Sequence, residues 1–157
     1  MNYIEMGETM RISAKGQYAL AAVISMAQQY NNEEYITVAS LAEKLDISKI
    51  YLEQAFSLLK RAGLVLSTKG AQGGYKLARM PKQITVLDVL LAVEASLFEQ
   101  TQKTASDKAP EINKALRLSV FDVLDRSITE TLRTITLSDL VNEAEKYKEE
   151  DAIMFYI

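Results

Sequence analysis

The stretch SKIYLEQAFSLLKRAGLVLSTKGAQGGYKLAR, residues 48–79, predicts one helix, a sharp bend and a β-hairpin. Its first half has the apolar spacing of an amphipathic helix, and Gly63 follows at the point where such a helix ends. Two short segments, residues 64–68 and 75–78, read as strands, and the loop between them contains three glycines. We therefore expect a helix to about Ala62, followed directly by a glycine-tipped hairpin.

Two further helices are predicted upstream of this stretch. Ser13 suits the N-cap of a helix that runs to about Tyr30, and Thr37 suits the N-cap of a shorter one. Residues 38–58 then have the pattern of a helix-turn-helix, although Asp46 occupies a turn position where glycine is common. The positions that this motif would bury are Leu41, Leu45, Ile47, Leu52 and Ala55.

The second half of the chain is also predicted to be helical. Thr85 and Thr136 each open a Thr-x-x-Asp capping box, so we expect helices from there to about Ala95 and Tyr147. A long helix over residues 111–134 lies between them and carries an apolar stripe. A second copy of this helix would cover the stripe in a symmetric dimer, and packing within one chain is the alternative. The dimer contacts are expected at Leu116, Val120, Phe121, Leu124, Ile128 and Leu132.

Composition excludes several classes of site. The chain contains no cysteine and no histidine. Disulfides, zinc knuckles, cysteine-ligated iron–sulfur clusters and Cys–His or Ser–His nucleophile pairs are therefore excluded. No apolar run approaches the roughly 20 residues that span a bilayer, and the acidic first ten residues do not have the pattern of a signal peptide. We expect a cytoplasmic protein that is not an enzyme and has no cofactor and no metal site.

Charge divides the chain into two unlike halves. Residues 11–82 carry 10 basic and 5 acidic side chains, whereas residues 83–157 carry 8 basic and 14 acidic ones. This division is typical of a protein that docks one end onto a polyanion such as DNA. Ordinary variation of surface charge is the alternative interpretation.

The helix predicted from Ser48 presents a polar face opposite its apolar stripe. On that face Glu53 could accept a hydrogen bond from cytosine, and Gln54 could bridge the edge of adenine. Ser48 with the helix N-terminus suits a phosphate, and so does Lys69 beside the glycines of the hairpin tip. A solvated helix face and an ordinary exposed turn are the alternatives.

Three groups of residues resemble the Rrf-two family of bacterial winged-helix regulators, the IscR/NsrR/CymR type. They are MRISAKGQYAL at residues 10–20, S-x-x-YLEQ at residues 48–54, and RAGLV with KGAxGGYxL within residues 61–77. The resemblance implies a homodimeric regulator, expected to be a repressor, on a palindromic operator. Its recognition helix would enter the major groove, and its wing would contact the minor groove or the backbone. Lys69 stands where relatives usually carry arginine. The residues expected to contact DNA are Arg11, Lys15, Ser48, Lys49, Tyr51, Glu53, Gln54, Ser57, Arg61, Lys69, Gln72, Gly73 and Gly74.

Many members of this family bind an iron–sulfur cluster through three cysteines in the loop before the long helix. Residues 92–110 contain none, so the chain resembles the cluster-free branch, and it has no thiol for redox sensing. The expected fold is mainly α with a small β-hairpin wing. We expect a disordered extension over residues 1–9, a winged helix-turn-helix domain over residues 10–82, and a helical dimerisation region with an apolar tail over residues 83–157.

The apolar tail resembles the C-terminus of the CymR-type regulators of cysteine metabolism. In that subgroup the partner is cysteine synthase, and the contacts here would come from Phe155, Tyr156 and Ile157. The alternative function is therefore a winged-helix interaction module that docks such an enzyme. Packing of the tail on the dimer or on the wing domain is the other interpretation.

Overall fold

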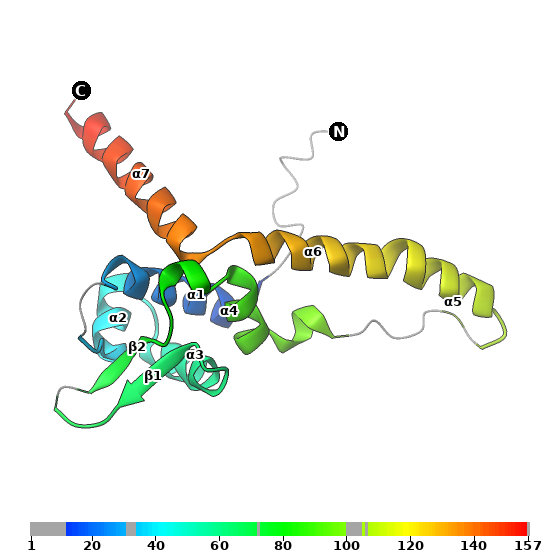
Figure 1. Cartoon of the computed structure of the whole chain (residues 1–157), viewed down its shortest axis with the longest axis horizontal. Coiled ribbons are helices and arrows are strands. Elements are labelled where there is room, and N and C mark those ends of the chain that lie inside the picture. The colour runs from blue at the N-terminus through cyan, green and yellow to red at the C-terminus, as the bar shows by residue number, and fades with distance from the viewer. Residues whose placement is uncertain (1–11, 31–33, 72, 100–104, 106, 157) are drawn as a thin grey trace.

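The described residues form a helical body with a two-stranded hairpin at one edge, and two helical arms leave this body in different directions (Figure 1). The computed structural model describes residues 12–30, 34–71, 73–99, 105 and 107–156. The predictions for residues 1–9, Arg11, Gln72 and Ile157 lie outside the described residues.

Three helices form the first part of the body, as the sequence predicts. They are α1 (Ala14–Gln28), α2 (Val38–Leu45) and α3 (Lys49–Arg61). The hydroxyls of Ser13 and Thr37 cap α1 and α2 by accepting hydrogen bonds from backbone N–H groups three residues on. Asp46 has a left-handed conformation with φ of 51°, so it replaces the glycine that is common at this turn.

The hairpin follows α3 after Gly63, whose φ of 74° ends the helix. Its strands are β1 (Val65–Thr68) and β2 (Gly74–Leu77), which pair antiparallel with Val65 opposite Leu77. The sequence did not predict a further bridge, in which Ile36 and Tyr75 exchange two backbone hydrogen bonds of 2.8 Å. This bridge ties the hairpin to the segment that precedes α2.

One hydrophobic core holds these elements together and continues into the second half of the chain. The predicted helix-turn-helix positions Leu41, Leu52 and Ala55 are buried, and Leu45 and Ile47 pack against them. The second half contributes Ile84, Val89, Val93 and Leu137 to the same core. The body therefore extends past the hairpin, because residues beyond 82 complete its interior.

The second half of the chain begins with short elements on the body. They are the 3-10 turn η1 (Pro81–Gln83), the helix α4 (Val86–Val93) and the 3-10 turn η2 (Ala95–Phe98). The predicted capping boxes are confirmed: each threonine hydroxyl accepts from an aspartate N–H, and each aspartate accepts from a threonine N–H. The two boxes lie against each other, since Thr85 bridges to Thr136 where α4 and α7 begin.

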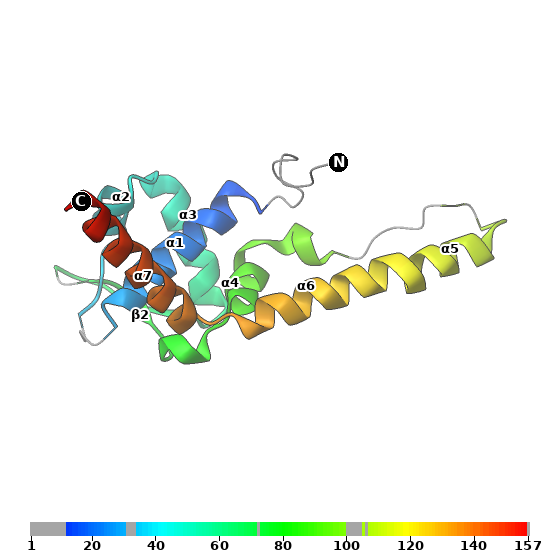
Figure 2. The same cartoon turned by 90° about the horizontal axis from the view of Figure 1, so that it is seen from above.

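The first arm consists of α5 (Pro110–Leu116), the π-helical turn η3 (Arg117–Phe121) and α6 (Asp122–Thr134). It is the long yellow and orange rod in Figures 1 and 2. The prediction of one regular helix over residues 111–134 is therefore wrong at η3, where the N–H of Asp122 donates to the carbonyl of Arg117 five residues earlier. Leu116, directly before this wider turn, and Phe121, its last residue, are both half-buried.

The second arm is α7 (Leu137–Phe155), which the sequence predicted to end near Tyr147. It continues for two more turns because residues 148–152, KEEDA, are mostly good helix formers and contain no glycine or proline. Most of the predicted apolar tail is thus the last turn of a helix. Ile153, Met154, Phe155 and Tyr156 are exposed there, so they do not pack on the wing domain of the same chain.

Candidate nucleic-acid interface

Helix α3 turns one face to the core and the opposite face to solvent. Its buried face consists of Leu52, Ala55, Phe56 and Leu59. On the outer face Glu53, Gln54 and Ser57 are exposed at helical spacing, and Ile50 precedes them by one turn with 67% of its surface exposed. The outer face is a polar strip with one aliphatic side chain, carried on a helix that fits the width of a DNA major groove.

The first turn of α3 offers groups that suit a phosphate. Ser48 is at the N-cap position, but its hydroxyl makes no capping hydrogen bond. The side chain of Lys49 pairs with Glu53 at 3.6 Å, and both side chains are more than half exposed. Such surface pairs contribute little to stability, so an incoming phosphate or base edge could replace either partner.

Helix α1 supports this end of α3. The ring of Tyr18 lies 6.0 Å from the ring of Tyr51, centroid to centroid, so Tyr51 packs on α1 while half of its surface stays exposed. Lys15 lies one turn before Tyr18 and is half-buried. Residues three apart on a helix share a face, so Lys15 lies on the side of α1 that faces the start of α3.

The hairpin carries Lys69, which is exposed. Gly70 beside it has a φ of 109° and no heavy atom within 4 Å of an added Cβ, so the turn conformation alone requires glycine there. The rings of Phe56 on α3 and Tyr75 on β2 lie 4.7 Å apart, which fixes the hairpin against α3. Figure 1 shows the hairpin and α3 at the same edge of the body.

Gly73 and Gly74, which the sequence predicts as DNA contacts, are also required by the hairpin itself. A Cβ on Gly73 would lie 2.7 Å from the carbonyl oxygen of Thr68. A Cβ on Gly74 would lie 2.5 Å from the carbonyl oxygen of Ile36. Both positions therefore need glycine for internal packing, whether or not their backbone meets DNA.

The structure does not bring all the predicted contacts together. Arg61 is exposed in the last turn of α3, and at 1.5 Å per residue it lies about 20 Å from Ser48 along the helix axis. It therefore belongs to the far end of α3, away from Glu53 and Gln54. Arg11 and Gln72 lie outside the described residues, so their positions stay predictions.

Glu94 is a buried charged residue that the sequence analysis missed. It follows α4, and its Oε2 accepts hydrogen bonds from the N–H of Ser13 at 2.9 Å and from the hydroxyl of Ser13 at 2.7 Å. The carboxylate thus lies at the N-terminus of α1, where the helix dipole favours negative charge. Glu94 follows the C-terminus of the apolar helix α4, where the dipole of that helix disfavours a negative charge. An acid in this position is the signal in the sequence that could have identified Glu94.

A second candidate surface follows the first arm. Of the predicted dimer residues, Leu116, Phe121, Ile128 and Leu132 are half-buried, whereas Val120 and Leu124 are exposed. Ile112, Leu118 and Val123 are further exposed apolar side chains on this arm. An apolar surface of this extent on a projecting helix is typical of an interaction surface.

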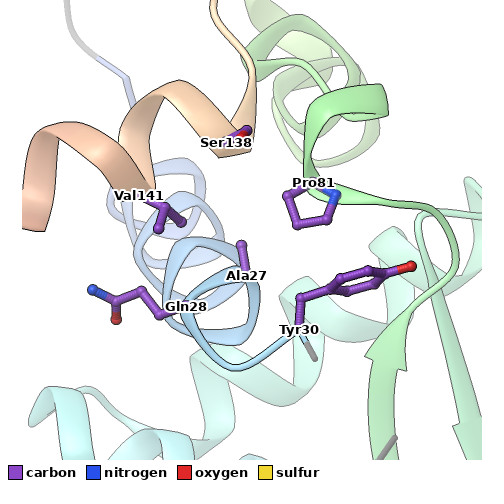
Figure 3. A pocket seen from close by; sticks show the side chains of 6 residues that line it. All are labelled: Ala27, Gln28, Tyr30, Pro81, Ser138 and Val141. Atoms are coloured by element: carbon purple, nitrogen blue, oxygen red, sulfur yellow. The ribbon is translucent and has the colours of Figure 1, made fainter. Parts of the chain in front are cut away.

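A small hollow lies where α7 meets the body. It has a volume of about 160 Å³ and is lined by Ala27, Gln28, Tyr30, Pro81, Ser138 and Val141 (Figure 3). Typical small-molecule sites measure roughly 300–1,000 Å³, so this hollow is too small for most ligands of that kind. It marks the junction of α1, η1 and α7.

The described residues contain no group of three or more Asp, Glu, His or Cys side chains that could hold a metal ion. Among the same residues, no helix is both long enough and apolar enough to cross a membrane.

Comparisons with known proteins match most of this chain. The family model Rrf2, described as an iron-dependent transcriptional regulator, matches residues 12–143. The HTH-type transcriptional regulator IscR of Pectobacterium atrosepticum is 35% identical over 136 residues, which cover 87% of this chain and 82% of that protein. IscR of Cereibacter sphaeroides is 43% identical over 89 residues, 56% of this chain and 57% of that protein.

Two solved structures resemble most of this chain. The structure of T. potens IscR has a TM-score of 0.68 at 36% identity and covers 88% of this chain and 91% of that one. The structure of CymR (YrzC), titled the global cysteine regulator of B. subtilis, has a TM-score of 0.69 at 30% identity. It covers 85% of this chain and 98% of that one. The predicted fold class, mainly α with a small hairpin wing, is confirmed.

Proposed function

Because the chain belongs to the Rrf2 family of transcriptional regulators, we propose that it is a homodimeric, sequence-specific DNA-binding regulator that acts as a repressor. Residues 10–82 bind DNA in this proposal, and residues 83–157 supply the dimer contacts. The solvent-exposed polar face of α3, fixed beside an exposed lysine on the hairpin, is the observation that carries it.

Each part of this interface has a defined role. Glu53 and Gln54 read base edges in the major groove, since carboxylate and amide groups match cytosine and adenine there. Ser48, Lys49 and Lys15 hold phosphates beside the first turn of α3. Lys69 contacts the backbone or the minor groove as a single charge, because lysine lacks the forked donors of arginine.

The apolar side of the first arm supports the dimer. Pairing two such arms in an isologous contact would remove Val120 and Leu124 from water together with their half-buried neighbours. Two-fold symmetry would then present two α3 helices to two half-sites, about 34 Å apart for successive turns of the same DNA groove. A palindromic operator follows from that symmetry.

The residues of this chain do not fit an iron–sulfur cluster, although the description of the family model names iron. Such clusters are held by cysteine thiolates, with histidine as the occasional substitute, and the sequence has neither. We propose that this member is cluster-free and that it responds to a noncovalent ligand, to a partner protein, or to no signal at all. Iron and acid-labile sulfide assays on the purified protein test this: stoichiometric amounts of both would contradict it.

The main experiment is selection of bound sequences from a random duplex pool with the purified full chain. Enrichment of a palindrome is expected, and its half-site spacing should match one turn of DNA. Pools that stay random in the absence and presence of cell-extract small molecules would contradict sequence-specific binding. A matched variant with Glu53→Ala and Gln54→Ala should lose the preference at the base positions that these two side chains read, while keeping salt-sensitive binding to duplex DNA.

The alternative of an interaction module for cysteine synthase is not favoured by the comparisons, in which the relatives named are regulators. The end of α7 is exposed, with 91% of Phe155 open to solvent, but nothing identifies its partner. Cysteine synthase binding through Phe155, Tyr156 and Ile157 therefore stays an untested prediction.

A further inference from the structure

We propose that Ile50 recognises the C5-methyl group of a thymine in each half-site and so sets one position of base specificity. This inference rests on the proposed DNA-binding function and deepens it. Among the large apolar side chains, helix α3 exposes two, Ile50 and Tyr51, over its whole described length. Tyr51 already packs against the ring of Tyr18, whereas Ile50 leaves two thirds of its surface in water.

The position of Ile50 places it among the predicted base-reading residues. Glu53 and Gln54 follow it by three and four residues, so all three share the outer face of α3. If Glu53 and Gln54 reach base edges, Ile50 enters the groove with them. The first turns of a recognition helix are also the part that lies deepest in the groove in helix-turn-helix complexes.

The chemistry of the major groove narrows the choice of partner to one group. An isoleucine side chain has no donor or acceptor, so it would leave the polar edge of guanine, cytosine or adenine without a hydrogen-bond partner. The C5-methyl group of thymine is the apolar group that the four bases present in this groove. Contact with it removes apolar surface from water on both sides.

A single methyl group separates thymine from uracil, and this gives a direct test. Full-length protein is titrated with the duplex obtained by selection, and each thymine in one half-site is replaced in turn by deoxyuridine. One replacement should weaken binding about fourfold, which is the expected effect of losing one buried methyl-sized contact. The other replacements should have little effect.

The variant Ile50→Ala then tests whether Ile50 is the side chain that contacts this methyl group. In the proposed homodimer both copies lose the contact, so this variant should bind the thymine duplex about as weakly as the unchanged protein binds a duplex with deoxyuridine at that position in both half-sites. It should lose nothing more when that thymine is replaced. Ile50→Val keeps two methyl groups and should keep most of the thymine preference. Because Ile50 is exposed and alanine favours helix, neither variant should lower the melting temperature.

Three outcomes overturn the inference. The first is a protein that tolerates deoxyuridine at every position, and the second is an Ile50→Ala variant that keeps the full fourfold preference. Both leave sequence-specific binding intact, so the proposed function would survive them. The third is failure to select any sequence, which rejects the proposed function together with the inference.

Discussion

At the scale of single residues, two glycines of the hairpin meet different constraints. Gly74 has a φ of 151°, and an added Cβ would lie 2.5 Å from the carbonyl oxygen of Ile36. Gly70 has a φ of 109° but open space around it. We expect Gly70→Ala to lower the free energy of unfolding by about 1 kcal/mol through backbone strain alone. Gly74→Ala should cost about 2–3 kcal/mol, because Ile36 must also move and its bridge to Tyr75 is lost. Urea unfolding followed by circular dichroism measures both, and equal losses would contradict the role given to the Ile36 contact.

A second residue-scale prediction concerns the buried carboxylate of Glu94. The N–H and the hydroxyl of Ser13 both donate hydrogen bonds to Oε2 of Glu94. Hydrogen bonds to a charged group contribute about 1.5–3 kcal/mol each to the free energy of unfolding. Glu94→Leu should therefore lower the free energy of unfolding by several kcal/mol, because the N–H and hydroxyl of Ser13 lose their acceptor.

Glu94→Gln is the matched control, since its amide oxygen can still accept from Ser13. It should cost clearly less than Glu94→Leu in the same urea titration. If the two variants are equally stable, the hydrogen bonds to Ser13 do not hold the start of α1.

At the scale of elements, the start of α7 depends on an ionised carboxylate. Hydrogen bonds from the backbone N–H and then the hydroxyl of Thr136 hold the pKa of Asp139 below its ordinary value. A lowered pKa means that the ionised form is favoured by folding, so its contribution is present above the unfolded pKa of about 3.9 and is lost as the pH falls through the lower folded value. We expect the stability gap between the unchanged protein and Asp139→Asn to shrink as the pH falls below about 4. Thermal unfolding of both proteins across this range checks it, and a gap independent of pH would contradict it.

The first arm supports another element-scale prediction. Leu124 is 54% exposed in the single chain, so Leu124→Asp should leave the fold and the melting temperature of the isolated chain unchanged. In a dimer that buries this side, the same change would place a charge in an apolar contact, which costs several kcal/mol. Sedimentation should therefore show monomers at micromolar concentration, and operator binding should weaken at least tenfold.

The matched control for Leu124→Asp lies on the same arm. Glu130→Ala breaks an exposed 2.9 Å ion pair with Arg133, and such pairs contribute less than about 1 kcal/mol. This variant should sediment as a dimer. A Leu124→Asp protein that is also dimeric would move the dimer contact elsewhere.

At the scale of the whole molecule, local signals in the sequence predicted most of the fold. Capping residues such as Ser13, Thr37 and Thr85 carry their information within four positions, and the structure confirms the helices that they begin. Contacts between distant segments could not be read in this way. The bridge from Ile36 to Tyr75 involves one residue on each side and therefore leaves no periodic pattern.

In the candidate site, too, local sequence patterns predicted some features, whereas contacts between distant residues were missed. The spacing of Leu52, Ala55, Phe56 and Leu59 predicted which face of α3 is buried, and by exclusion it predicted the exposed face that carries Glu53 and Gln54. The pairing of Ser13 with Glu94 spans 81 positions, so only the folded chain reveals it. The π turn at Arg117–Phe121 was missed because the residues there are acceptable in a regular helix.

Salt should affect the two proposed interfaces of the molecule differently, weakening DNA binding but not the dimer contact. Binding of DNA by residues 11–82, as proposed, would release counterions. Its association constant should therefore fall steeply with salt, with a slope of about −0.9 for each phosphate contact in a plot of log K against log salt. The proposed dimer contact along the first arm is apolar, and burial of apolar surface is not weakened by added sodium chloride. Between about 50 and 200 mM salt, operator affinity measured by fluorescence anisotropy should therefore drop by orders of magnitude while sedimentation still shows a dimer. Lys69→Ala should reduce the slope by about 0.9 for each hairpin that engages DNA, and by the same amount for every duplex sequence. A slope unchanged by Lys69→Ala would show that Lys69 makes no phosphate contact. A dimer that dissociates at the same salt concentration as the DNA complex would show that charge, and not the apolar arm, holds the subunits together.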